Sequence, residues 1–451
     1  MTFTLEQIAA ALGMAAPARA RVTGWSVDTR TLLTGDLFLG LRGPVDDGNV
    51  YLEVAFAKGA CGAIAERGSE AGPVLQVADG QAALHRLAAW ARAQWPGEII
   101  GVTGSAGKTS TKDVIASLLL TQRATAKTQG NFNNHVGLPL SILRMPEQAE
   151  LAVLEIGMNH SGEIRDLAAI AKPRVGVVTN VGSAHIEFFD SVDGIAAAKR
   201  ELIEALPANG VAVLNADDAR VVRFGEAHPG QTITFGLSEG ADVRAENVRF
   251  ESQSVCFRAQ GTEFKTCLTG RHNVRNILAG IAVAGIYGIA PGDLRDAVHD
   301  LQPAPMRGER TWYDGIELLN DCYNSNPDAA KSMLDVLRDT PATRRIAVLG
   351  EMLELGRWSE SLHRDVGNYA AASGIDVLVG IRGAAKTMAD AAIIAGLPAT
   401  AAYFFEDPTE AGVHLRTIAR EGDAILFKGS RGTHVERAME TFTAGAVQAH
   451  P

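Results

Sequence analysis

The feature that most constrains this chain is an apolar run that leads directly into a glycine-rich loop. Residues 99–103, IIGVT, have the composition of a buried strand, and apolar side chains at positions 114, 115, 118 and 119 then recur at helical spacing. The loop between them consists of Gly104, Ser105, Ala106, Gly107, Lys108, Thr109 and Ser110. A loop between a strand and the start of a helix presents free backbone N–H groups and the positive end of the helix dipole, which together favour an anion.

Two side chains of this loop suit a nucleoside triphosphate. Lys108 can reach the β- and γ-phosphates, and the hydroxyl of Thr109 can bind Mg²⁺. The loop departs from the pattern G-x-x-x-x-G-K-[ST], because Val102 stands where that pattern has its first glycine. The alternative is a glycine turn with a solvated lysine. The order of strand, loop, GKT and helix favours a triphosphate site.

Further apolar runs also end in polar residues, among them AVLEIG, VGVVTN and VAVLNADD. Their alternation with helical segments predicts an α/β fold with a parallel sheet and an active site at the carboxyl ends of its strands. Glu155, His185 and Lys199 follow successive units of this kind. A carboxylate and a neutral imidazole there could hold a second Mg²⁺. Taken singly, a residue such as His185 is more often a structural loop histidine, and one such as Lys199 is more often a solvated helix residue.

Four other segments carry polar side chains after expected strands or at expected helix starts. They are SVDTR, GRHNVRN, NDCYNSNPD and FKGSRG, the last of which offers cationic and hydroxyl donors suited to a carboxylate or phosphate. Helix capping and surface turns are the competing explanations. Their candidate site residues are Ser26, Asp28, Arg30, Asn273, Asn276, Asp321, Asn324, Asn326, Lys428, Ser430 and Arg431.

Length, charge and cysteine usage narrow the class of protein. A chain of 451 residues is too long for one compact core, so two or three domains are expected. The net charge of -10 argues against nucleic acid as a partner, and four scattered cysteines argue against a disulfide framework or a zinc site. The start of the chain lacks the basic residues of a signal peptide, and its longest uncharged apolar run, residues 277–290, is too short to span a membrane. We therefore expect a soluble, cytoplasmic protein with no membrane span.

The motifs together resemble the Mur ligases. TGSAGKTSTK, QGNFNNHVGLPL, EIGMNHSGEI, TNVGSAHIEFFD, LNADD, GRHNVRN, NDCYNSNPDAA, LGEMLELG and KGSRG occur in the family's order, and the family resembles this chain in using the shorter T-G-x-x-G-K-T loop. The resemblance implies three domains: residues 1–97 for a UDP-sugar, 98–305 for ATP, and a Rossmann-like domain at 306–451 for the incoming amino component.

The resemblance also implies an activity. The chain is most similar to the branch of the family that joins D-alanyl-D-alanine to UDP-N-acetylmuramoyl-tripeptide in cell-wall precursor synthesis. That branch uses ATP and Mg²⁺ and proceeds through an acyl phosphate. We expect a monomer. The ligase that adds a diamino acid to the UDP-dipeptide is the alternative, but its D-N-P-R motif has no counterpart beyond EDPTE, which lacks the arginine. A P-loop switch that hydrolyses nucleotide is a less favoured alternative.

Site roles follow from the resemblance residue by residue. It implies that Lys108, Glu155, His185 and Lys199 serve catalysis, with Lys199 carbamylated near the second metal. It places Asn273 and Asn276 near the adenine, and Arg307 and Asp321 at the phosphates and ribose. The dipeptide carboxylate would lie near Lys428, Ser430 and Arg431. The UDP-sugar would contact Ser26, Asp28 and Arg30, and its peptide-bearing end would lie near Asn133 and Asn134. Asn324 and Asn326 are further candidates for contact with substrate. Two departures stand out: His135 occupies a position where the family has an acidic residue, and Arg310 is an alternative to Arg307.

Overall fold

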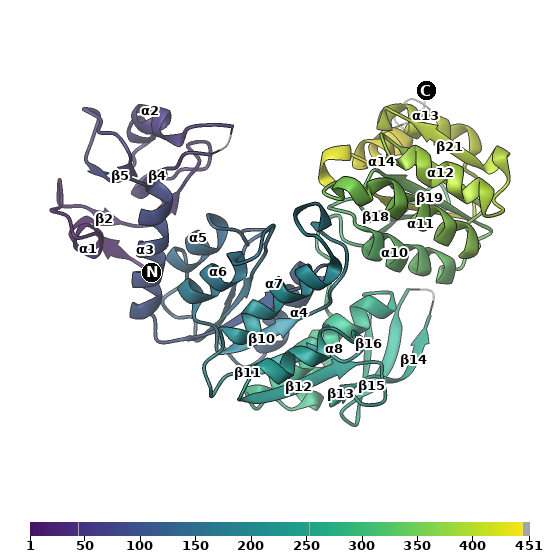
Figure 1. The fold of residues 1–451 in the computed structure, drawn as a ribbon, viewed down its shortest axis with the longest axis horizontal. Coiled ribbons are helices and arrows are strands. Elements are labelled where there is room, and N and C mark those ends of the chain that lie inside the picture. Colours follow the sequence, from purple (N-terminus) through teal and green to yellow (C-terminus); the bar gives the residue numbers. More distant parts are fainter. Residues whose placement is uncertain (44, 252, 445–451) are drawn as a thin grey trace.

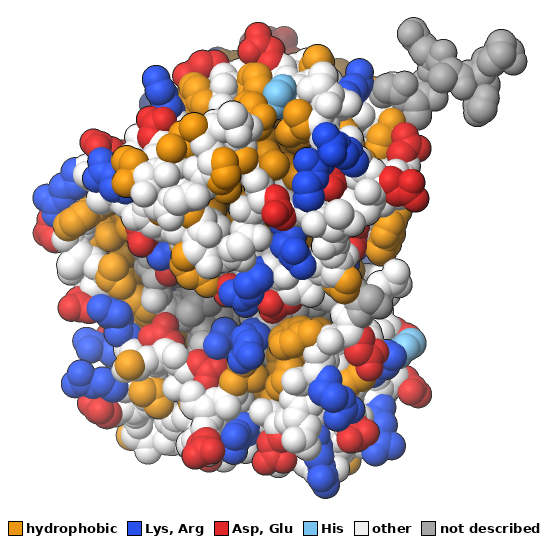
Figure 2. Space-filling model, turned by 90° about the vertical axis from the view of Figure 1, so that its right-hand side faces the viewer, with side chains coloured by type: hydrophobic (Ala, Val, Ile, Leu, Met, Phe, Trp, Pro, Cys, Tyr) orange, Lys and Arg blue, Asp and Glu red, His pale blue; other side chains and the backbone are white. Residues whose placement is uncertain are grey.

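The computed structural model describes residues 1–43, 45–251 and 253–444. Within these residues the strands form five sheets, which belong to three bodies that follow one another along the chain (Figure 1). The central body lies between the other two in sequence, and a groove separates it from the C-terminal body on the face drawn in Figure 2. No helix of the described residues is both long and apolar enough to cross a membrane.

The N-terminal body is built on a small parallel sheet, β3-β4-β5-β6, beside the antiparallel pair β1-β2. Its first helix begins at a capping box, in which the Thr4 hydroxyl and the Gln7 side chain each accept a backbone N–H. Its elements are β1 (Phe3–Thr4), α1 (Leu5–Ala11), β2 (Arg21–Val22), β3 (Gly24–Ser26), β4 (Asp36–Gly40), η1 (Gly48–Tyr51), α2 (Leu52–Ala57), β5 (Gly62–Ala65), β6 (Val74–Gln76) and α3 (Gly80–Gln94).

The central body contains a seven-stranded parallel sheet in the order β13-β12-β11-β10-β7-β9-β8. Strand β7 lies inside the sheet, between β10 and β9, and successive side chains face opposite cores. Ile100 and Val102 pack with α4 and α8, and Ile99 packs on the other face. The elements are β7 (Glu98–Thr103), α4 (Lys108–Leu119), β8 (Thr125–Lys127), α5 (Gly137–Leu143), β9 (Leu151–Glu155), α6 (Glu163–Ala171), β10 (Val175–Val178), η2 (Ile186–Phe188), α7 (Val192–Glu204), β11 (Val211–Asn215), η3 (Val222–Ala227), β12 (Gln231–Gly236) and β13 (Val243–Arg244).

An antiparallel sheet, β14-β15-β16, and two helices complete the central body. Helix α8 is the buried helix that the apolar run 277–290 predicts, and it packs against α4. The elements are β14 (Glu246–Phe250), β15 (Val255–Ala259), β16 (Thr262–Thr266), α8 (Arg271–Ile286), η4 (Pro291–Leu294) and α9 (Arg295–His299).

The C-terminal body has a six-stranded sheet in the order β17-β18-β22-β19-β20-β21, parallel except for β17. Strands β22, β19, β20 and β21 form most of this sheet, and β17 and β18 extend it on one side. Its elements are β17 (Glu309–Tyr313), β18 (Ile316–Asp321), α10 (Pro327–Asp339), β19 (Arg344–Gly350), η5 (Gly356–Trp358), α11 (Ser359–Ala372), β20 (Val377–Ile381), α12 (Ala385–Ile394), η6 (Ala399–Ala401), β21 (Ala402–Phe405), α13 (Pro408–Ile418), β22 (Asp423–Lys428), η7 (Arg431–Thr433) and α14 (Glu436–Thr443). The predicted α/β class with parallel sheets is confirmed.

Candidate active site

The glycine loop lies between β7 and α4, as predicted, and its shape requires glycine. Gly104 has φ 152°, and a Cβ atom there would lie 1.8 Å from the Oγ1 of Thr179. Gly107, with φ 80°, directly precedes the first residue of α4. The Nζ of Lys108 folds back and donates to the carbonyl of Gly104 at 2.7 Å. The loop is therefore a built anion site with its lysine already turned over it.

The strand next to β7 holds this loop in place. The hydroxyl of Thr179 donates to the Ala106 carbonyl at 2.7 Å, and the Oδ1 of Asn180 accepts the Ala106 N–H at 2.8 Å. The Oγ of Ser105 accepts the N–H of Gly182 at 2.8 Å. Thr179 and Asn180 line the same cavity, although neither was predicted as a site residue. Both follow β10, so the rule that side chains gather at the carboxyl ends of parallel strands could have identified them.

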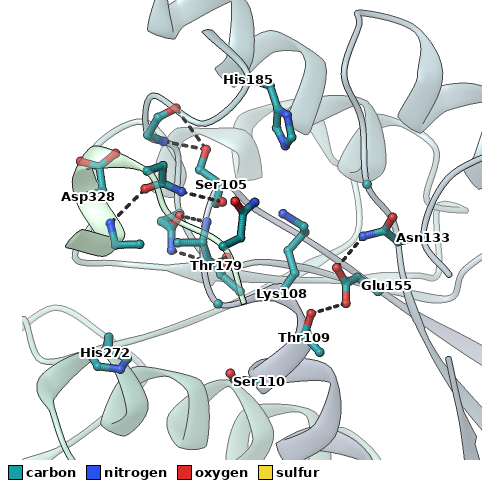
Figure 3. Close-up of a pocket in the computed structure, with 18 of the residues that line it drawn as sticks. Ser105, Lys108, Thr109, Ser110, Asn133, Glu155, Thr179, His185, His272 and Asp328 are labelled. Atoms are coloured by element: carbon teal, nitrogen blue, oxygen red, sulfur yellow. Dashed lines mark hydrogen bonds between the residues drawn. The ribbon is translucent and has the colours of Figure 1, made fainter. Parts of the chain in front are cut away.

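Oxygen donors meet beside the loop at a position that suits Mg²⁺. The hydroxyl of Thr109 donates to the Oε2 of Glu155 at 2.7 Å, and the Nδ2 of Asn133 donates to its Oε1 at 2.7 Å (Figure 3). Glu155 is buried. Mg²⁺ is bound in such sites by one or two carboxylates or hydroxyls, with phosphates and water filling the remaining positions. The donor set of Thr109 and Glu155 fits that ion.

Two lysines in this region have lowered pKa values. Burial lowers the pKa of Lys108, against the attraction of Glu155. The side chain of Lys199, on α7, is almost completely buried, and burial followed by the charge of Lys108 lowers its pKa well below the usual value. Lys199 is not among the residues that line the cavity. A lysine held as a neutral amine is the form that reacts with carbon dioxide, because only the free amine has a lone pair to donate.

His185 enters the cavity at a different place from Glu155, on the other side of Lys108 in Figure 3. Its Nδ1 lies 2.6 Å from the Oε2 of Glu354, a residue of the C-terminal body. The close contact with His185 lowers the pKa of Glu354. Among the described residues, no three His, Cys, Asp or Glu side chains are grouped so that they could hold a metal by themselves. A cation at His185 would therefore depend on phosphate, water or a modified Lys199 for its other ligands.

Two arginines of the C-terminal body lie near the cavity in sequence terms, but only one of them lines it. The guanidinium of Arg307 lies 3.9 Å from the ring centroid of Tyr323, and both residues line the cavity. Arg310 instead forms an ion pair with Glu317 at 2.5 Å, and these side chains are only 11% and 12% exposed. Of the two arginines that the sequence left open, Arg307 is the one whose charge faces the cavity.

The segment before α10 contacts the glycine loop directly. Asn326 caps α10 by accepting the N–H of Ala329, and its Nδ2 lies 3.5 Å from the carbonyl of Ser105. The carboxylate of Asp328 accepts the N–H of Ser183 at 3.1 Å. Asn326 therefore both caps α10 and contacts the glycine loop. Asp328 was not predicted, because its partner lies 145 residues away in the chain.

The start of α8 supplies the amides near the loop. Asn276 accepts a hydrogen bond from the Thr111 hydroxyl at 3.0 Å and donates to Asn273 at 3.1 Å. Its Oδ1 lies 3.1 Å from where a Cβ of Gly107 would stand. The neighbouring His272 also lines the cavity, and burial lowers its pKa to about 4.

One cavity of about 770 Å³ collects most of the predicted residues. Asp321 and Lys428 face it as an ion pair, so the lysine charge is partly neutralised. The predicted residues that line it are Ser105, Ala106, Gly107, Lys108, Thr109, Ser110, Asn133, Asn134, Glu155, His185, Asn273, Asn276, Arg307, Asp321, Asn324, Asn326 and Lys428. His135 lines it too, 3.6 Å from Glu163.

Seven predicted residues are not among those that line this cavity: Gly104 and Lys199, described above, and five others. Ser26 is buried in the N-terminal body, and the carboxylate of Asp28 is paired with the exposed Arg30 at 2.7 Å. The Oγ of Ser430 accepts the N–H of Leu353 at 2.9 Å. The fifth residue, Arg431, is 60% exposed and contacts Glu436.

The chain matches two family models, the Mur ligase middle domain over residues 102–284 and the Mur ligase, glutamate ligase domain over residues 306–431. It is 35% identical to the UDP-N-acetylmuramoyl-tripeptide--D-alanyl-D-alanine ligase of Bacillus subtilis (strain 168), over 93% of each chain. Against the enzyme of the same name from Escherichia coli (strain K12) it is 32% identical, over 92% of each chain.

Solved structures agree with the sequence matches. MurF from Acinetobacter baumannii aligns with a TM-score of 0.90 and 30% identity, over 98% of this chain and 99% of that chain. The MurF ligase from Thermotoga maritima in complex with ADP aligns with a TM-score of 0.83 and 29% identity, over 93% of this chain and 97% of that chain. The resemblance seen in the sequence motifs is confirmed, and the chain belongs to the Mur ligase family.

Proposed function

We propose that this protein is an ATP-dependent ligase that joins D-alanyl-D-alanine to UDP-N-acetylmuramoyl-tripeptide in peptidoglycan precursor synthesis. The observation that carries the proposal is one continuous cavity, which runs from the glycine loop past Asn133 to the carboxyl ends of β18 and β22. Such a cavity can hold a triphosphate, an acyl group and an amine together. The names of relatives that match over more than nine tenths of both chains supply the substrates.

The reaction needs two displacements, because a carboxylate is a poor electrophile. In the first, a carboxylate oxygen of the tripeptide attacks the γ-phosphorus of ATP; the bond from that phosphorus to the β,γ-bridging oxygen breaks, giving an acyl phosphate and ADP. In the second, the amine of D-alanyl-D-alanine attacks the acyl carbon. The tetrahedral intermediate loses phosphate and the nitrogen loses a proton, which leaves the amide. Positioning and charge stabilisation do most of this work.

The residues around the glycine loop stabilise the first step. Lys108 swings from the Gly104 carbonyl to the phosphates, and Arg307 meets them from the C-terminal body. Both cations oppose the charge that accumulates when two anions approach. Thr109 and Glu155 would hold Mg²⁺, which would screen the triphosphate. His185 and a carbamylated Lys199 would hold a second Mg²⁺ near the acyl phosphate.

The remaining assignments complete the substrate sites. The three segments 1–97, 98–305 and 306–451 serve as domains for the UDP-sugar, the nucleotide and the dipeptide. The UDP-sugar lies against the turn of Ser26, Asp28 and Arg30. Asn273 and Asn276 lie by the adenine, and Asp321 by the ribose. The peptide-bearing end of the UDP substrate contacts Asn133, Asn134, Asn324 and Asn326, and the dipeptide carboxylate is met by Lys428, Ser430 and Arg431.

The test is phosphate release from Mg-ATP with UDP-N-acetylmuramoyl-tripeptide and, in separate reactions, D-alanyl-D-alanine, D-alanine or a diamino acid. We expect release only when the tripeptide and the dipeptide are both present, and mass spectrometry should show the pentapeptide product. Release with a diamino acid and the UDP-dipeptide would instead assign the preceding step. Release with ATP alone, unaffected by any of these substrates, would contradict the ligase proposal.

A further inference from the structure

The loop that carries His185 is contacted by the C-terminal body at several points between Ser183 and Asp190. This loop, residues 179–190, follows β10 of the central body. Asp328 accepts the N–H of Ser183 at its start, and Arg357 donates to the carbonyl of Asp190 at 3.3 Å at its end. Between these contacts, the N–H of Glu187 donates to the carbonyl of Glu354 at 3.1 Å. The position of the loop therefore depends on a body to which it does not belong in sequence.

The contact between Glu354 and His185 lies in the middle of this interface. The His185 Nδ1 and the Glu354 Oε2 are 2.6 Å apart. Both residues have a left-handed backbone, with φ 63° for His185 and φ 61° for Glu354, which is uncommon outside glycine. Gly356 approaches so closely that a Cβ there would lie 2.9 Å from the Cγ of Glu187. Two unfavourable backbone conformations facing each other across an interface are typical of a functional site.

Stability alone does not account for this pair. The side chain of Glu354 is 45% exposed, and ion pairs with so much exposure contribute little to folding. Orientation is a better explanation. A carboxylate on one ring nitrogen of a histidine selects the tautomer and the ring position, and leaves the other nitrogen available to a metal ion.

We propose that Glu354 is a positioning residue: when the C-terminal body is docked, its carboxylate holds the Nδ1 of His185 and presents Nε2 to a divalent cation in the cavity. The proposal rests on the proposed function only in taking His185 as a ligand of the second cation. Its consequence is that this cation site is complete only in the docked arrangement. Formation of the acyl phosphate is then coupled to the presence of the body that binds the attacking amine.

The chain offers a set of variants that separates this role from docking itself. Glu354→Ala removes the carboxylate, and Glu354→Gln keeps an acceptor oxygen. His185→Ala removes the ligand. Arg357→Ala is the matched control, because Arg357 belongs to the same interface and contacts Asp190 rather than His185.

The measurement is Mn²⁺ binding in the presence of saturating ADP, followed by electron paramagnetic resonance, which requires no turnover. We expect two Mn²⁺ sites in the unmodified protein and a second site weakened at least tenfold in Glu354→Ala, the size typical of losing such a partner. His185→Ala should lose the same site, and the double variant should lose no more than His185→Ala. Glu354→Gln should recover part of the affinity, and Arg357→Ala should bind both ions normally.

Activity assays add a second readout. Glu354→Ala should raise the Mg²⁺ concentration for half-maximal phosphate release about tenfold, with the KM for ATP unchanged. Unaltered Mn²⁺ affinity in Glu354→Ala, a single site in the unmodified protein, or an equal loss in Arg357→Ala would each overturn the positioning role. None of these outcomes depends on which amine is the substrate, so the proposed function can fail while this proposal stands.

Discussion

Methionine substitutions of Arg307 and Arg310 should have opposite consequences, although the two residues are three positions apart. Arg310→Met leaves the carboxylate of Glu317 without its partner in a place where that side chain is 12% exposed. Breaking a buried pair costs about 3–5 kcal/mol, so we take the lower end, about 3 kcal/mol, for a pair that retains slight exposure. A loss of 1 kcal/mol shifts the melting temperature of a body of this size by about 2–4 °C. The C-terminal transition should therefore fall by about 6–12 °C.

Arg307→Met should lower the melting temperature by no more than about 4 °C, because the variant loses only the stacking of Arg307 on Tyr323, which contributes roughly 0.5–1 kcal/mol. It should instead lose a charge-assisted contact with the nucleotide of about 1.5–3 kcal/mol. Since each 1.4 kcal/mol is about a factor of ten, the KM for ATP should rise roughly 10- to 150-fold.

The assay pairs differential scanning calorimetry with steady-state phosphate release for each variant. The double variant Arg310→Met with Glu317→Leu is the control, and it should regain at least half of the lost melting temperature, because no buried charge then remains unpaired. The reasoning is refuted if Arg310→Met raises the KM for ATP while its melting temperature is unchanged, or if Arg307→Met shows only a loss of stability.

Three other predictions concern the same cavity. Gly104→Ala should abolish ADP binding in calorimetry, because its methyl group meets the Thr179 hydroxyl and strains a positive φ; ADP binding within threefold of the unmodified protein would contradict this. Lys199, whose pKa burial lowers well below the usual value, should give a carbamate signal in ¹³C spectra under labelled carbon dioxide, and Lys199→Met should lack both that signal and activity; activity that survives removal of bicarbonate would count against a carbamate. Because burial lowers the pKa of His272 to about 4 while the unfolded chain binds its proton near pH 6.5, stability should be full above about pH 6.5 and fall between about pH 6.5 and pH 4. Melting curves of His272→Asn should fall less steeply over that range, and an equal slope would exclude His272 as the cause.

The local part of the site could be predicted from the sequence. The glycine loop, the meeting of Thr109 with Glu155 and the place of Asn326 at a helix start depend on contacts that strand order and helix capping dictate. The parallel sheets followed from the alternation of apolar runs with helical segments, because each buried strand needs helices on both faces.

Contacts between residues far apart in the chain could not be predicted from the sequence. Lys428 was expected as a cation for a carboxylate ligand, but it pairs with Asp321, which lies 107 residues earlier. Glu354 was part of a recognised motif, yet nothing in that motif indicates that its partner is His185. Sequence patterns report the face on which a side chain lies, whereas pairing across a groove depends on how whole bodies dock.

That difference bears on how a ligase of this kind avoids wasting ATP. If the site for phosphoryl transfer were complete within the central body, water could replace the amine as the attacking group. Instead, Arg307 and the partner of His185 come from the body that is proposed to bind the dipeptide. Asn326 and Asp328 of the same body contact the glycine loop and the loop after β10. On the proposed function, completion of the site by docking ties activation of the carboxylate to the body that receives the amine, because the groups proposed to stabilise the transferred phosphate and those proposed to receive the dipeptide belong to that one body.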